Sequence, residues 1–108
     1  METVRLKKKS LRISANLREQ LFGKHQFAFG SFKPEQKMLV LAGVESPFFA
    51  KVHQPEQYFM KQVSAAGEVS IPVHDLELDH EIQLEEGELP AEINTRTGIM
   101  KIYFSTSL

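Results

Sequence analysis

The chain has 108 residues, 42% of them hydrophobic, and can therefore bury one core without support from disulfides or metals. It contains no cysteine, which excludes a disulfide framework, a thiolate zinc site and a cysteine nucleophile. No apolar run approaches the length of a membrane span, and none follows the first lysines as in a signal peptide. We therefore expect a soluble cytoplasmic protein that does not associate with a membrane.

The net charge of −1 hides a division of the chain into two halves of opposite sign. Residues 1–54 hold ten Lys or Arg against four Asp or Glu, a charge of +6, whereas residues 55–108 hold three against ten, a charge of −7. The positive half can attract polyanions, and the negative half can attract a basic protein partner, including the positive half of a second copy. Alternatively, the two halves neutralise each other's charge within a single fold. The sequence leaves both interpretations, partner binding and internal neutralisation, open.

Alternation of apolar and polar residues predicts a series of short strands, with the period of a half-buried strand. In chain order they cover residues 3–8, 10–14, 25–32, 38–42, 58–63, 69–71, 81–84, 91–94 and 99–104. Ser14 is placed to cap a helix whose leucines, Leu17 and Leu21, lie four residues apart, and Gly23 supplies the residue that often ends such helices. Residues 43–56 form a connector with one short element.

These elements predict a mostly β, barrel-like protein with one or two short helices. We take residues 1–108 as a single domain that contains an internal repeat, a basic unit over residues 1–54 and an acidic unit over residues 55–108. With an offset of 58, residues 11–14 (Leu-Arg-Ile-Ser) lie over residues 69–72 (Val-Ser-Ile-Pro). An accidental match between two alternating strands is the competing explanation.

Two segments resemble a known family. Residues 4–23 read as strand, turn, strand and a short helix, and residues 66–72 read Ala-Gly-Glu-Val-Ser-Ile-Pro. In this pattern they resemble the AbrB, SpoVT and MraZ group of swapped-hairpin DNA-binding proteins, whose units have a strand ending in Ile-Pro, a short helix and a hairpin. The resemblance covers about half of the chain. It implies a homodimer that interlocks its hairpins and binds DNA.

The chain also departs from the family pattern. Ser10 stands where the family has glycine, Ser14 where it has proline and Glu68 where it has arginine. Residues 73–78 are acidic where the resemblance implies a basic helix. Only the first unit is therefore expected to touch DNA, while the acidic unit holds the dimer or the partner unit together.

The cations of the first unit give a physical reason for the same expectation. Five of them fall within eight residues around a predicted strand and turn, and a sixth lies on the predicted helix; the candidate DNA-binding residues are Arg5, Lys7, Lys8, Lys9, Arg12 and Arg18. Lysine and arginine neutralise phosphates, arginine can read guanine edges, and a two-stranded ribbon fits a major groove. The alternative role for the lysine run is protection of an edge strand against pairing.

Three further patterns have competing explanations. His74, Asp75, Asp79 and His80 offer nitrogen and oxygen ligands for a metal or an acid–base pair, but their spacing fits no ligand pattern, and a solvated acidic loop is the preferred interpretation. The acidic run over residues 75–88 alternates with apolar residues, which predicts a strand with one wet face. Seven aromatic residues are interpreted as core rather than as a base-stacking platform; they are Phe27, Phe29, Phe32, Phe48, Phe49, Tyr58 and Phe59.

No phosphate-binding glycine loop, nucleophile elbow or catalytic serine pattern is present, so the sequence indicates a protein that is not an enzyme and uses no cofactor or metal. The function that we predict is a DNA-binding transcriptional regulator that acts as a dimer through the basic unit. The alternative is a structural or adaptor β domain that assembles proteins through its charged faces. The third candidate is an enzyme or metal-binding module that uses the histidines and aspartates named above.

Overall fold

The computed structural model describes residues 2–23, 25–43 and 56–107. In the first half it has β1 (Glu2–Lys7), β2 (Ser10–Ile13), α1 (Ala15–Phe22), β3 (Phe27–Lys33) and β4 (Met38–Gly43). In the second half it has β5 (Glu56–Phe59), β6 (Lys61–Gln62), β7 (Val69–Pro72), α3 (His74–His80), β8 (Gln83–Leu84), β9 (Gly87–Asn94), β10 (Ile99–Tyr103) and β11 (Thr106–Ser107). Nearly all of the predicted connector, residues 43–56, lies outside the described residues.

Helix α1 begins and ends where its sequence signals predict. The hydroxyl of Ser14 accepts a hydrogen bond from the N–H of Leu17 at 3.3 Å, which satisfies one of the free donors of the first turn. Gly23 follows the helix with φ of +61°, a conformation that costs glycine little. Leu17 and Leu21 are both buried. The predicted helix is therefore confirmed.

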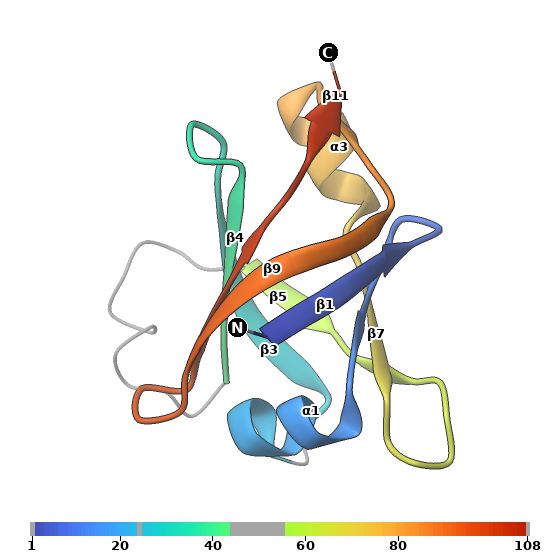
Figure 1. Cartoon of the computed structure of the whole chain (residues 1–108), viewed down its shortest axis with the longest axis vertical. Coiled ribbons are helices and arrows are strands. Elements are labelled where there is room, and N and C mark those ends of the chain that lie inside the picture. The colour runs from blue at the N-terminus through green and yellow to red at the C-terminus, as the bar shows by residue number, and fades with distance from the viewer. Residues whose placement is uncertain (1, 24, 44–55, 108) are drawn as a thin grey trace.

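Within the described residues, nine of the strands form one antiparallel sheet that curls into a nearly closed barrel (Figure 1), and β8 pairs with β11 in a separate two-stranded sheet. The strand order of the nine-stranded sheet is β5-β3-β4-β10-β9-β1-β2-β7-β6, and its two ends are consecutive in the chain. Strands β5 and β6 are separated only by Met60, and they pair with β3 and β7 respectively. This one stretch of chain therefore joins the two ends of the sheet. The prediction of a mostly β, barrel-like fold with two short helices is confirmed.

The strand pairings of the two halves correspond one to one. The pairing β1–β2 matches β6–β7, β1–β9 matches β3–β5, and β3–β4 matches β9–β10. The remaining pairings, β2–β7 and β4–β10, each join a strand of the first half to the equivalent strand of the second half. The partners Val4 and Leu89 correspond in this way to Tyr58 and Ala28. The chain is thus arranged around an approximate two-fold axis that relates residues 2–43 to residues 56–103.

Strands of each half pair with strands of the other half within one chain. The β1–β2 hairpin, blue in Figure 1, lies beside β9 of the second half, and β5 of the second half lies beside β3 of the first. Within the described residues, the β1–β2 hairpin pairs with β9 and β7, and the hairpin formed by β5, β6 and β7 pairs with β3 and β2.

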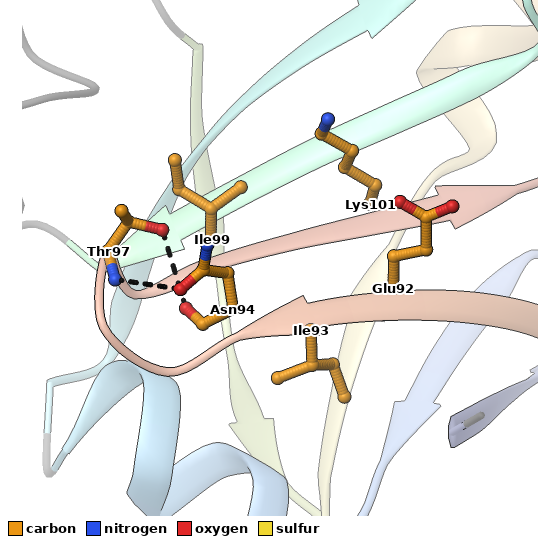
Figure 2. A pocket seen from close by; sticks show the side chains of 6 residues that line it. All are labelled: Glu92, Ile93, Asn94, Thr97, Ile99 and Lys101. Carbon is orange, nitrogen blue, oxygen red and sulfur yellow. Dashed lines mark hydrogen bonds between the residues drawn. The ribbon is translucent and has the colours of Figure 1, made fainter.

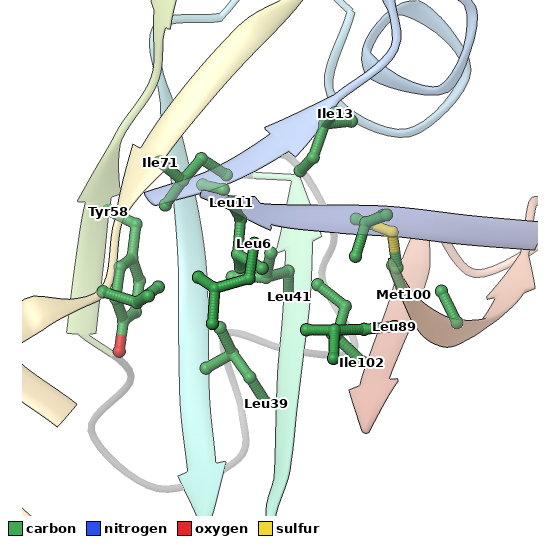
Figure 3. Packing of buried hydrophobic residues seen from close by; sticks show 14 of the residues in the cluster. Leu6, Leu11, Ile13, Leu39, Leu41, Tyr58, Ile71, Leu89, Met100 and Ile102 are labelled. Carbon is green, nitrogen blue, oxygen red and sulfur yellow. The ribbon is translucent and has the colours of Figure 1, made fainter. Parts of the chain in front are cut away.

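Inward-facing side chains from both halves fill the barrel (Figure 3). Eleven of the largest are less than 2% exposed: Leu6, Leu11, Ile13, Leu39, Leu41, Ile71, Leu89, Met100, Ile102, Val69 and Val73. In β1, β2 and β7 the buried residues alternate with more exposed ones, so the register of these strands is fixed by which residues face the core, whereas every residue of β4 is buried. The outward residues of β1 and β2 are fixed by the same constraint.

Helix α3 corrects two predictions. The acidic run was predicted to begin as a strand or a solvated loop, but residues 74–80 form a helix. Leu76 is buried and Leu78 is 64% exposed, so the two leucines do not share the inner face that a strand would give them. The helix has no capping side chain at Val73, and its last turn is followed by Glu81 at φ of +53° instead of by glycine. The capping side chain and the terminal glycine that mark α1 are therefore absent here, and only the acidic first turn and His80 in the last turn indicate a helix.

Candidate nucleic-acid interface

The three lysines of the first hairpin lie at its turn. Lys7 pairs with Ser10, which leaves Lys8 and Lys9 as a two-residue loop with φ of +51° and +65°. Positive φ at both loop positions is typical of a type I′ turn, which usually takes Asn and Gly. For a residue with a side chain this backbone costs about 1–2 kcal/mol. Contacts outside the hairpin must therefore hold it.

Three groups of the acidic half hold this turn. The N–H of Lys8 donates a hydrogen bond to the Glu86 carboxylate. The N–H of Val73 donates to the carbonyl of Lys9 at 2.9 Å. The Lys9 ammonium lies 2.5 Å from Oε1 of Glu77. The turn is thus fastened to α3 and to the segment that leads into β9.

Glu77 is a buried carboxylate that sequence reasoning counted only among surface charges. Its side chain is 7% exposed, and its second oxygen accepts a hydrogen bond from the N–H of Leu84 at 2.8 Å. The hydrogen bond from Lys9 lowers the pKa of this carboxyl below its usual value, against the opposing effect of burial. No local pattern could have marked Glu77, because the lysine that pairs with it, Lys9, belongs to the first hairpin, 68 residues earlier in the chain.

Arg5 and Arg12 lie directly opposite each other on β1 and β2. Their neighbours Leu6 and Leu11 are buried, so both arginines project from the outer face of the sheet. Like charges in direct cross-strand contact destabilise a strand pair. The two guanidiniums therefore need anionic partners.

Carboxylates of the acidic half supply these partners. Nη2 of Arg5 lies 3.8 Å from Oε1 of Glu88, and Nη1 of Arg12 lies 3.6 Å from Oε1 of Glu68. Neutralisation of one half by the other within the fold is therefore observed at these residues. All four side chains are at least 34% exposed, so each ion pair contributes only about 0–1 kcal/mol. A stronger anion can displace such carboxylates at low cost.

A polar hollow of about 460 Å³ lies over this part of the sheet. Arg5, Lys7, Arg12 and Ser14 line it together with the two carboxylates, which leaves an excess of one positive charge. Nε of Arg12 is buried and has no hydrogen-bond partner within the described residues. Cationic and hydroxyl donors that converge in this way suit the oxygens of a phosphate.

Arg18, the sixth predicted residue, belongs to a different element. It lies on α1, where its Nη2 donates a hydrogen bond to the carbonyl of His25 at 3.2 Å and so ties the helix to the segment that follows it. The hairpin thus brings together Arg5, Lys7, Lys8, Lys9 and Arg12, and Arg18 has a structural contact of its own.

The histidines and aspartates of α3 do not gather at one point. His74 at the start of the helix lies 3.5 Å from Glu77 through Nδ1, whereas the ring of His80 at its end packs on Phe32 at 4.7 Å. In residues 2–23, 25–43 and 56–107, no group of three or more His, Asp or Glu side chains is arranged to hold a metal ion. The predicted solvated loop at these positions is wrong, because they belong to a helix.

The aromatic residues divide between the core and the surface. Tyr58 is 8% exposed, and the prediction of core packing is confirmed for it. It is wrong for Phe27 and Phe59, which are 43% and 48% exposed and contact each other edge to face at 5.7 Å. Phe29 and Phe32 are partly buried, each against a hydrophobic cluster. Phe48 and Phe49 lie outside the described residues.

Two other hollows have simpler explanations. Figure 2 shows one of about 400 Å³ at the β9–β10 turn, lined by Glu92, Ile93, Asn94, Thr97, Ile99 and Lys101. The carboxamide oxygen of Asn94 accepts hydrogen bonds from the N–H groups of Arg96 and Thr97 at 3.0 and 3.3 Å, as turns require. A smaller hollow of about 200 Å³ contains Tyr58, whose hydroxyl lies 3.4 Å from Glu56, and burial raises the pKa of that hydroxyl. We assign no ligand to either.

Comparisons with models of protein families, with curated proteins and with solved structures give no match. Neither helix of the described residues has the length and apolar character needed to cross a membrane.

Proposed function

We propose that the chain is a DNA-binding transcriptional regulator that contacts phosphates and base edges through the β1–β2 hairpin. The observation that carries the proposal is the placement of Arg5 opposite Arg12 on an exposed face, beside Lys7 and within a polar hollow. Arginine pairs are suited to phosphate and to guanine, and a two-stranded ribbon fits a major groove. The pairing of the β1–β2 hairpin with β9 of the other half also supports the proposal, because the swapped-hairpin DNA-binding proteins that the sequence resembles pair their hairpins between units.

The proposal includes a dimer and a cytoplasmic location, where such a regulator meets DNA. Because both hairpins are already paired within one chain, two copies would meet through their outer surfaces rather than by interlocking. Sedimentation at several concentrations measures the oligomeric state directly.

The test is fluorescence anisotropy of labelled genomic duplex fragments at low and physiological salt. We expect binding that weakens with salt, with a log–log slope of about −0.9 for each phosphate contact. The double variant Arg5→Ser/Arg12→Ser should bind more weakly, with a slope smaller in magnitude by about two contacts. The matched control Arg96→Ser/Lys101→Ser removes the same charge from the β9–β10 hairpin and should bind like the wild type. Absence of binding at low salt, or equal losses in both double variants, would contradict the proposal.

An adaptor that binds a basic protein is the second candidate. Four exposed carboxylates of α3 and the segment after it form no ion pair within the described residues: Asp75, Asp79, Glu81 and Glu85. They leave a negative surface that the basic half does not neutralise. A labelled lysine-rich peptide in the same assay tests this candidate. Peptide binding that is lost in Asp79→Asn/Glu81→Gln, with no duplex binding, would favour the adaptor.

A further inference from the structure

The arginine pair is the start of a longer row of outward side chains. Arg12 of β2 is the register partner of Ser70 on β7, and Ser70 is the register partner of Lys61 on β6. Neighbouring strands lie about 4.8 Å apart, so Lys61 stands about 14 Å from Arg5 across the sheet. The positive side chains of the first half therefore continue onto the second half at Lys61.

The row then reaches the exposed aromatic pair. Phe59 precedes Lys61 by two residues, and Met60 between them is 3% exposed, so Phe59 and Lys61 project from the same outer side of their strands. Phe27 is the direct register partner of Phe59 on β3. The outer side of the curled sheet thus carries, strand by strand from β1 to β3, Arg5, Arg12, Lys61 and the two phenylalanine rings.

The approximate two-fold axis shows that the fold does not require these rings. The cross-strand pair Phe59 and Phe27 occupies the place in the second half that Arg5 and Glu88 occupy in the first. An exposed ion pair fills one of these equivalent positions and an aromatic pair the other. The barrel therefore accepts either kind of pair at this position, and the two exposed rings are available to a ligand.

The exposed area of the Phe27–Phe59 pair limits the kind of partner that can cover it. A fully buried Phe covers about 150–250 Å², so the exposed parts of Phe27 and Phe59 together offer only about 200 Å². A stable protein interface needs about 800 Å² from each partner. A single nucleobase stacked on a ring fits the smaller area, and Lys61 beside it suits the phosphate backbone.

We propose that this surface binds a nucleic acid with a single-stranded segment, with phosphates along Arg5, Arg12 and Lys61 and an unpaired base stacked on the Phe27–Phe59 pair. The inference rests on the proposed function, because it extends the same arginine face. It names the ligand more narrowly, as a strand with at least one base free to leave its helix.

The test compares a labelled single strand of about 12 nucleotides with the matching duplex, by anisotropy, with 2-aminopurine in the single strand to report stacking. We expect the single strand to bind more tightly and its 2-aminopurine fluorescence to be quenched. Phe59→Leu and Phe27→Leu should each weaken single-strand binding about tenfold and abolish the quenching. The control Leu78→Ser changes another exposed apolar residue, on α3, and should change nothing. Thermal melts confirm that each variant is folded.

The outcomes separate the two proposals. If Arg5→Ser/Arg12→Ser weakens binding while duplex and single strand bind alike and both phenylalanine variants bind like the wild type, the stacking site is overturned and the DNA-binding function stands. If neither nucleic acid binds at low salt, both proposals fail. If single-strand binding depends on the phenylalanines, and both duplex and single-strand binding depend on the arginines, both proposals are supported.

Discussion

Lys9 and Glu77 join the two halves of the chain through a contact of 2.5 Å between Nζ and Oε1. The lysine belongs to the strained hairpin turn, and the carboxylate belongs to α3 and is almost fully buried. The contact therefore couples the geometry of the basic hairpin to the packing of the acidic half.

The first prediction concerns pH. The pKa of Glu77 is lower in the folded protein than in the unfolded chain, chiefly because of the hydrogen bond from Lys9. A lowered pKa gives a contribution to stability that is fully present above the unfolded value of about 4.3 and is lost as the pH falls through the folded value. We expect Glu77→Gln to lower the free energy of unfolding at pH 7 by about 1–2 kcal/mol.

Urea denaturation of both proteins at pH 7, and at steps below pH 5, measures this contribution. The difference between wild type and Glu77→Gln should shrink as the pH falls. Glu81→Gln, a change of the same kind at an exposed residue, is the control and should cost little at either pH. A difference that stays constant down to acid pH would show that the charge of Glu77 does not stabilise the fold.

A second prediction concerns the close approach of Tyr58 to Gly30. A Cβ atom at position 30 would lie 2.4 Å from Cε2 of the tyrosine ring, which is buried and cannot move freely. Gly30→Ala should therefore destabilise the protein by about 1–3 kcal/mol, as overpacking does. Thermal or urea unfolding measures the loss. In a Tyr58→Leu background the ring is absent, so the same substitution should cost clearly less, and an equal cost would place the strain elsewhere.

A third prediction concerns the strained turn. Lys8 has φ of +51°, which asparagine tolerates better than lysine. Lys8→Asn keeps the N–H that binds Glu86 and should stabilise the protein by about 0.5–1 kcal/mol. Unfolding experiments give the change in stability, and the anisotropy assay gives the change in affinity. Weaker binding by this more stable variant would assign Lys8 to phosphate contact, while a less stable variant would contradict the strain argument.

The sequence predicted the elements with local signals and missed those fixed at long range. Ser14 and Gly23 mark the ends of α1, because a cap and a left-handed residue act within the helix itself. Helix α3 lacks both signals, and alternating Leu76 and Leu78 imitated a strand. The cationic hairpin was predicted as a segment, but its ion pairs with Glu77 and Glu88 depend on a register between distant strands that no local pattern contains.

The exposed phenylalanines show a second physical reason why part of the sequence-based prediction was wrong. Alternation in β3 predicts that one set of side chains faces inward, and hydrophobicity favours Phe27 over Ala28. The structure buries Ala28 and leaves Phe27 exposed, because Tyr58 from the neighbouring strand fills the interior beside the small residues of β3. Which face of β3 is inward is therefore decided by a side chain of the neighbouring strand β5. The candidate stacking site could not have been placed from β3 alone.

The last prediction uses the ion pairs as competitors of the proposed ligand. Glu88 and Glu68 contact the same guanidiniums that we assign to phosphates, so a bound strand must displace them. Each exposed pair is worth about 0.2–1 kcal/mol, and its removal should raise the affinity of Glu68→Gln and of Glu88→Gln for nucleic acid about 1.4- to fivefold at low salt. Glu35→Gln, in the exposed β3–β4 turn, changes the net charge equally and should have a smaller effect. Anisotropy titrations of the three variants measure these affinities. If Glu68→Gln and Glu88→Gln bind no better than Glu35→Gln, the arginines keep their carboxylates when the ligand binds, and the phosphate contacts must be assigned to other cations.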